Sequence, residues 1–105
     1  MTDSDTFHTI QPTNGRPAIR FEGRLMAEVS GERPGQLRWA ELKAYQTKSG
    51  RWIVEQTGMT TVEGEEVFKD VLIFDTADDM TAKVGFGRLA EKLWMKLGFD
   101  TVTIR

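Results

Sequence analysis

Apolar and charged residues alternate along the first half of the chain in the manner of half-buried β-strands. Residues 18–29 show the clearest case, with Ile19, Phe21, Leu25, Ala27 and Val29 separated by polar or charged positions. Successive side chains of a strand point to opposite faces, so this period of two predicts a strand with one buried side. A turn is expected at residues 31–35, where glycine and proline favour chain reversal.

Two more strands are predicted after this turn. Residues 36–47 carry apolar positions that switch parity near Trp39 and Ala40, and a β-bulge at that point explains the switch. Lys48-Ser49-Gly50 predicts a tight turn, and residues 51–56 predict a strand that pairs back onto the preceding one.

The next segment is ambiguous before a clear strand begins. Residues 58–66 fit either the end of a strand or an exposed loop, because Thr and Val give way to a run of glutamate and glycine. Residues 67–74, with the sequence VFKDVLIF, have high β-propensity and predict a further strand.

The C-terminal third predicts helix. Asp75 or Thr76 suits the N-cap, and Gly85 and Gly87 predict a break into two pieces. The second piece ends at Gly98, which suits the left-handed position after a helix. Its apolar stripe consists of Phe86, Leu89, Ala90, Leu93 and Leu97.

These elements predict an α+β fold in the order ββββαβ, with a twisted antiparallel sheet of about five strands. The last strand is expected at residues 99–105. The helix, in one piece or split at Gly85 and Gly87, is expected to pack on one face of the sheet. Residues 1–17 are polar and rich in turn formers, so we expect a flexible N-terminal arm. Residues 18–105 are expected to form one domain.

Several local phrases resemble the EXLDI family of small bacterial proteins from residue 19 onward. They are Arg20-Phe21-Glu22-Gly23-Arg24-Leu25, Tyr45-Gln46-Thr47-Lys48-Ser49-Gly50 and Val71-Leu72-Ile73-Phe74-Asp75. The naming motif, Glu-x-Leu-Asp-Ile, is similar to Asp100-Thr101-Val102-Thr103-Ile104, with Thr103 in place of its acid. The resemblance implies the same order of elements and no assigned activity.

Composition narrows the function classes. The chain has 105 residues, a net charge of −2 and no cysteine, which removes disulfides and thiolate metal sites. The first residues lack the basic and apolar parts of a secretory signal, and no apolar run is long enough to span a membrane. We therefore expect a small cytoplasmic protein.

The sequence offers little material for catalysis. His8 is the one histidine and falls in the expected arm, and the serines have no partnered base. Glu63, Glu65 and Glu66 with Asp70 read as a solvated turn rather than a metal site. We predict that the protein is not an enzyme and that it uses no metal and no cofactor.

Aromatic and arginine side chains instead favour a binding role. Aromatics and arginine often anchor protein interfaces, which makes candidates of Trp39, Trp52, Trp94, Tyr45 and Arg51. The first hypothesis is a non-catalytic protein that docks on another protein or protein complex through a sheet edge or this Trp and Arg surface. Inhibition of a bacterial or phage-related defence or nuclease complex is one form of such a role.

Two alternatives remain at this stage. A nucleic-acid-binding module would use basic residues of the early strands, namely Arg20, Arg24, Arg38, Lys43 and Lys48. A homodimer would form through sheet edges or the face that carries Trp94.

Overall fold

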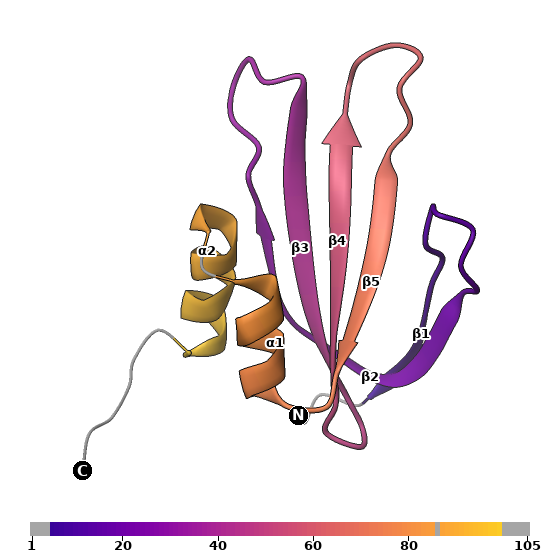
Figure 1. Ribbon diagram of the computed structural model, residues 1–105, viewed down its shortest axis with the longest axis vertical. Helices are drawn as coiled ribbons and strands as arrows, with labels where there is room; N and C mark the ends of the chain where they lie inside the picture. Colours follow the sequence, from indigo (N-terminus) through magenta and orange to yellow (C-terminus); the bar gives the residue numbers. More distant parts are fainter. Residues whose placement is uncertain (1–4, 86, 100–105) are drawn as a thin grey trace.

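The computed structural model describes residues 5–85 and 87–99, and it contains a five-stranded antiparallel sheet and two helices (Figure 1). The strands lie in the order β1-β2-β3-β4-β5, and both helices lie on one side of the sheet. The predicted α+β fold is confirmed. The bounds are β1 Thr6–Ile10, β2 Ile19–Ser30, β3 Arg38–Thr47, β4 Trp52–Thr60, β5 Phe68–Phe74, α1 Ala77–Val84 and α2 Arg88–Leu97.

The N-terminal segment differs from the prediction. Residues 6–10 form β1, which pairs with residues 19–23 of β2, and Ile10 is buried. The expectation of a flexible arm is therefore wrong for this segment. The cause is the pair His8 and Ile10, which share one face of the strand: Ile10 is buried, and the His8 ring stacks on Phe21 with ring centroids 5.2 Å apart, while Phe7 is exposed on the other face.

The bulge also lies elsewhere than predicted. The β3–β4 register runs without a shift from Arg38 to Gln46, so β3 has no bulge near Trp39. The irregularity lies in β2, between Leu25 and Ala27. An extra residue reverses which side of the sheet the following side chains face.

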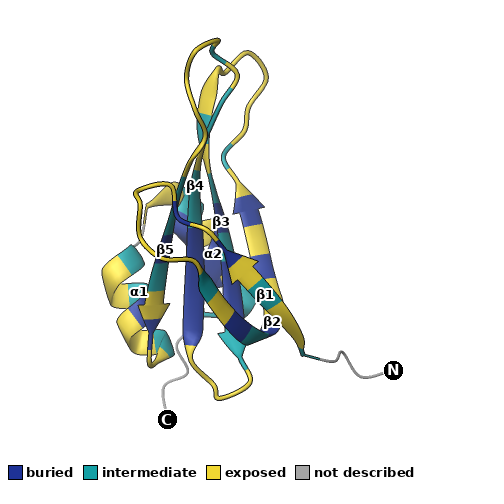
Figure 2. Ribbon diagram, turned by 90° about the vertical axis from the view of Figure 1, so that its right-hand side faces the viewer, coloured by how far each residue is buried: buried dark blue, intermediate teal, exposed yellow. Residues whose placement is uncertain are grey.

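Because of this bulge, the two halves of β2 contribute to different cores. Figure 2 shows how buried and exposed residues alternate along the strands. Ala27 and Val29 join the helix-side core, which is completed by Leu42, Ala44, Trp52, Val54, Phe74, Met80, Ala90, Leu93 and Trp94. Phe21 belongs to a second core on the other face, with Ile10, Tyr45, Ile53 and Val71. We call this second cluster the inner core, because the sheet curls around it.

The β1–β2 loop closes part of the curl. The Thr13 backbone N–H donates to the Lys69 carbonyl oxygen at 2.9 Å, and the Lys69 N–H donates to Thr13 Oγ1 at 2.8 Å. Arg16 pairs with Asp70 and donates to the Val71 carbonyl oxygen at 3.1 Å. A loop that follows the first strand thus covers the outer edge of the last strand.

The helical region follows the prediction. Thr76 caps α1 by accepting from the Asp79 N–H, and the chain breaks between the helices at Gly85 and Gly87. Gly98 ends α2 in the left-handed conformation, with φ of 78°. The predicted strand at residues 99–105 lies outside the described residues except for Phe99, which is not in a strand. None of the described helices is long and apolar enough to cross a membrane.

Candidate binding surfaces

Two of the three tryptophans nominated as interface anchors are core residues. Trp52 is 7% exposed and Trp94 is 3% exposed, so neither offers a face to a partner. The indole N–H of Trp94 donates to the Gly85 carbonyl oxygen at 2.8 Å, which joins α2 to the end of α1. The prediction that Trp52 and Trp94 are surface anchors is therefore wrong, because both side chains are buried. Trp39 is half-buried, and its indole N–H donates to Glu41 at 3.0 Å.

Tyr45 is also buried, in the inner core beside a buried carboxylate. Its hydroxyl lies 3.4 Å from Glu55, which is 4% exposed and forms an ion pair with Lys69 at 3.2 Å. Burial and the charge of Glu55 raise the pKa of Tyr45 to about 12. Burial of Glu55 is matched by two polar partners, so this cluster is a satisfied part of the core rather than an open site.

His8 does not lie in a loose arm. Its Nε2 is 3.2 Å from the Gly23 carbonyl oxygen, and its ring contacts those of Phe21 and Tyr45. Within residues 5–85 and 87–99, no three His, Asp or Glu side chains gather in a way that would hold a metal ion.

The basic residues nominated for nucleic-acid binding do not form one surface. Arg38 is held by Glu65, whose pKa falls to about 2 because it accepts hydrogen bonds from Arg38 and Thr60. Lys43 is the register partner of both Glu28 and Glu55, so acids flank it on each side.

The remaining basic candidates lie toward the turn between β3 and β4. Arg24 is 4.0 Å from Asp5. Arg20, Lys48 and Arg51 line one groove together. The structure therefore brings only these three of the predicted residues together.

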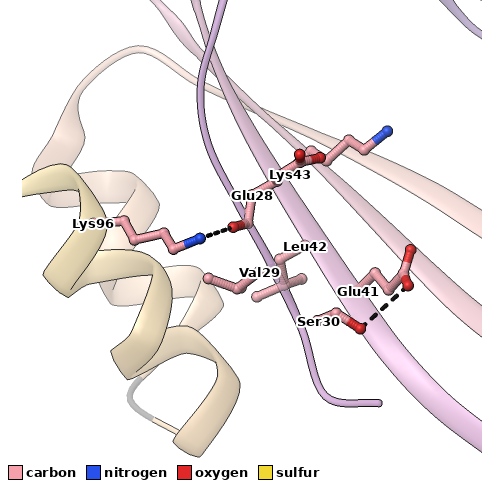
Figure 3. A pocket seen from close by; sticks show the side chains of 7 residues that line it. All are labelled: Glu28, Val29, Ser30, Glu41, Leu42, Lys43 and Lys96. Carbon is pink, nitrogen blue, oxygen red and sulfur yellow. Dashed lines mark hydrogen bonds between the residues drawn. The ribbon is translucent and has the colours of Figure 1, made fainter.

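A different surface is formed by the second half of β2, from Arg24 to Ser30. β1 pairs with β2 only as far as Gly23, so in the described part of the chain no strand pairs with the outer edge from Arg24 to Ser30. At this edge Lys96 Nζ of α2 donates to the Glu28 carbonyl oxygen at 2.8 Å (Figure 3). A lysine side chain thus occupies a backbone acceptor that a neighbouring strand would normally take.

This edge lies beside a groove, which we call the edge groove. A cavity of about 370 Å³ is lined by Glu28, Val29, Ser30, Glu41, Leu42, Lys43 and Lys96. A neighbouring cavity of about 310 Å³ continues it along α2 and adds Lys92 and Met95. Met95 is 63% exposed, so the groove has an accessible apolar wall beside the edge of β2.

The two sides of the edge groove differ in charge. Lys92 and Lys96 lie on the helix side, and Figure 3 shows Val29 pointing toward the same side. Glu41 projects to the other side, where its Oε2 accepts from Ser30 Oγ at 3.2 Å. The groove is thus basic and apolar on one side of the edge and carries Glu28 and Glu41 together with Lys43 on the other.

None of the sequence candidates except Lys43 lines the edge groove. Lys92 and Lys96 lie off the predicted apolar stripe of the second helix, where lysines are ordinary surface residues, so the sequence gives no hint of a groove. The sequence shows the long alternation of β2 but did not predict the short β1 that pairs with only part of it, so it gave no signal of this edge.

No protein-family model matches the chain, and neither the curated proteins nor the solved structures contain a match. The resemblance to the EXLDI family therefore stays a prediction.

Proposed function

We propose that the protein is a non-catalytic binding protein that receives an extended segment of a partner protein in the edge groove. The observation that carries this proposal is the outer edge of β2 from Arg24 to Ser30, which has no neighbouring strand among the described residues. An extended segment can add to such an edge through main-chain hydrogen bonds, while grooves beside it select side chains.

The charges of the edge groove define the partner segment. Successive side chains of an added strand alternate between the two sides of the edge. Those on the helix side meet Lys92, Lys96 and the apolar surface of Val29 and Met95, so they are acidic or apolar. Those on the opposite side meet Glu28 and Glu41 together with Lys43, so they are polar.

A protein of this kind acts by occupying a strand of its partner. Such binding is stoichiometric and needs no cofactor, and it blocks or tethers the segment that it holds. Inhibition of a defence or nuclease complex in the cytoplasm is the form of this function that we favour.

The first test uses a synthetic strand. The probe is the blocked peptide Thr-Glu-Thr-Val-Thr-Glu-Thr, in which Glu, Val and Glu share one face. Amide shifts of the full-length protein are followed by NMR, and saturable changes are expected in β2 from Arg24 to Ser30 and in α2 near Lys96. A peptide with Lys in place of both Glu residues is expected to bind at least about tenfold more weakly, since it meets two lysines.

Backbone pairing is tested separately. N-methylation of the peptide at the residues whose N–H groups face β2 removes the donors that pair with the edge, and binding is expected to be lost. Two protein variants test the charges: Lys96→Glu weakens binding, whereas Lys83→Glu, an exposed lysine on α1, leaves it unchanged.

Three results would contradict the proposal. They are equal binding of the N-methylated peptide, equal binding of the lysine peptide, or shift changes confined to other strands. Binding of a single-stranded oligonucleotide with a steep dependence on salt, lost in a variant with Arg20, Arg24 and Arg51 changed to glutamine, would favour the nucleic-acid alternative instead.

A further inference from the structure

The last helix runs along the second half of β2 in the opposite direction. A Cβ at Gly31, just after β2, would lie 4.0 Å from Leu89 near the start of α2. Lys96, near the end of α2, reaches back to the Glu28 carbonyl oxygen. The end of α2 therefore points toward Arg24, where the edge of β2 without a paired strand begins.

The last described residue lies level with the start of this edge. Phe99 follows α2, and its ring packs against that of Trp52, with ring centroids 5.7 Å apart. In the register of the sheet Trp52 is the partner of Gln46, and Gln46 is the partner of Arg24. The residues after Phe99 thus enter at the Arg24 end of the edge groove.

The sequence after Phe99 has the chemistry that the edge groove selects. It reads Asp-Thr-Val-Thr-Ile-Arg over residues 100–105. In an extended chain Asp100, Val102 and Ile104 share one side, so this side is acidic and apolar, as suits the lysines and the exposed Met95 of α2. The other side carries two threonines and an arginine, which suit the polar side of the groove with its two glutamates.

The length of this sequence also suits the edge. Six extended residues reach about 20 Å. The edge from Arg24 to Glu28 is about 13 Å long, at about 3.3 Å for each residue, which leaves about 7 Å for the approach from Phe99. The same six residues are too few to pass along the edge to Ser30 and return, so they can only run in the direction of β2.

We infer that residues 100–105 of the same chain occupy the edge groove as an extended segment parallel to β2, and that a partner strand must displace them. In this arrangement Asp100 lies within reach of Lys96, and the Glu28 carbonyl oxygen accepts from the segment instead of the lysine. The displacement step rests on the function proposed for the edge groove and adds its regulation.

The tether favours this occupant over a separate chain. A segment that is joined to the end of α2 has a high effective concentration at the groove, since it loses no translational freedom on binding. It also covers a strand edge that would otherwise invite association. The apparent affinity for a partner strand is lowered in proportion to the fraction of molecules in which the groove is open.

Hydrogen exchange at one amide tests the occupancy. The N–H and C=O groups of a residue in an antiparallel strand point to the same side, so the Glu28 amide faces the outer edge as its carbonyl does. We expect this amide to exchange at least about tenfold more slowly in the full-length protein than in a variant that ends at Phe99. The Val54 amide, in the buried centre of β4, is the reference for global stability in both proteins.

A matched pair of variants tests the two sides of the segment. Val102→Lys places a charge against the two lysines of α2, so exchange at Glu28 is expected to rise to the rate of the shortened variant. Thr103→Lys adds the same charge at the next position, toward Glu28 and Glu41, and is expected to leave the slow exchange unchanged.

Competition tests the displacement. The acidic strand peptide is expected to bind the variant that ends at Phe99 at least about threefold more tightly than it binds the full-length protein. Val102→Lys is expected to behave as the shortened variant does, and Thr103→Lys as the full-length protein does.

Three outcomes would overturn the inference. They are equal exchange at Glu28 in the full-length and shortened proteins, an equal effect of the two lysine substitutions, or slow exchange that is lost on dilution together with a dimer in light scattering. The last result would place the segment in the groove of a second copy.

Failure of this inference is distinguishable from failure of the proposed function. Equal peptide binding at β2 in the full-length and shortened proteins, with equal exchange at Glu28, keeps the strand-binding function and rejects occupancy by residues 100–105. Slow exchange at Glu28 in the full-length protein, with no peptide binding to the shortened variant, keeps the occupancy and rejects the strand-binding function.

Discussion

Tyr45 shows how strongly one side chain is shaped by its surroundings. It is the only tyrosine of the chain, and it is buried beside Glu55 under the curled sheet. Loss of water around the phenol and the nearby carboxylate both oppose its ionisation, so its pKa rises from 10.0 to about 12. In the unfolded chain the phenol ionises at its ordinary pKa.

This difference predicts a loss of stability in alkali. Below pH 10 the contribution of Tyr45 is fully present, and it is lost as the pH rises from 10.0 to about 12, because only the unfolded chain ionises there. The slope has an upper limit of about 1.4 kcal/mol per pH unit. Urea unfolding of the wild type and of Tyr45→Phe between pH 8 and 11.5 measures it. If both proteins lose stability equally, the raised pKa is contradicted.

The tryptophans mark the limit of sequence reasoning at this scale. The predicted stripe of α2 placed Trp94 at its edge, where burial and exposure are equally compatible with the pattern. In the structure Ala90, Leu93 and Trp94 are the buried residues of α2, so the centre of the stripe is turned toward Trp94. The direction of that turn depends on how the helix packs on the sheet, and periodicity alone does not contain it.

At the scale of elements, β2 explains both a success and an error of the sequence analysis. Its alternation predicted a strand correctly, but Phe21 and Ala27 have the same parity and face different cores. The bulge between Leu25 and Ala27 separates them, and a uniform alternation conceals it. The parity switch near Trp39 was visible in the sequence but has no bulge behind it, because β3 has apolar residues on both of its faces.

Two glycines of the sheet give a matched pair of predictions. A Cβ at Gly23 would collide with the β3 backbone at Gln46 and Thr47, which cannot move aside without breaking the register. A Cβ at Gly58 would meet the Phe68 Cβ at 3.8 Å, an ordinary contact. Gly23→Ala is therefore expected to destabilise the fold by about 1–3 kcal/mol. Gly58→Ala is expected to be neutral or stabilising by up to about 1 kcal/mol.

Chemical unfolding of the two alanine variants, with the wild type as reference, measures this difference. Equal midpoints for Gly23→Ala and Gly58→Ala would show that β2 and β3 are not in the close contact described here.

At the scale of the whole molecule, the edge groove and the closure of the sheet depend on how far β1 and the loop after it reach. β1 begins at Thr6 and covers only residues 19–23 of β2, so among the described residues the edge from Arg24 to Ser30 lies beside α2 without a paired strand. The curl of the sheet also brings the β1–β2 loop to the outer edge of β5, where Thr13 bonds to Lys69. The sequence predicted the strands and helices, but not this closure, because contacts such as Thr13 with Lys69 join residues far apart in the chain.

The contact between the β1–β2 loop and the outer edge of β5 can be tested directly by hydrogen exchange. The Lys69 amide has Thr13 Oγ1 as its acceptor, so Thr13→Ala removes that bond and exposes the amide whenever the loop lifts. Exchange at Lys69 is expected to become much faster, while amides in the centre of β4, such as that of Val54, keep the rate set by global unfolding.

Arg16→Gln, which loses the pair with Asp70 and the bond to Val71, is expected to act in the same direction. Its loss of stability is expected to stay below about 1 kcal/mol, since the pair is partly exposed. If Lys69 exchanges at the global rate in the wild type and in both variants, the loop is not what protects the edge of β5, and the curled sheet must be held together by its inner core alone.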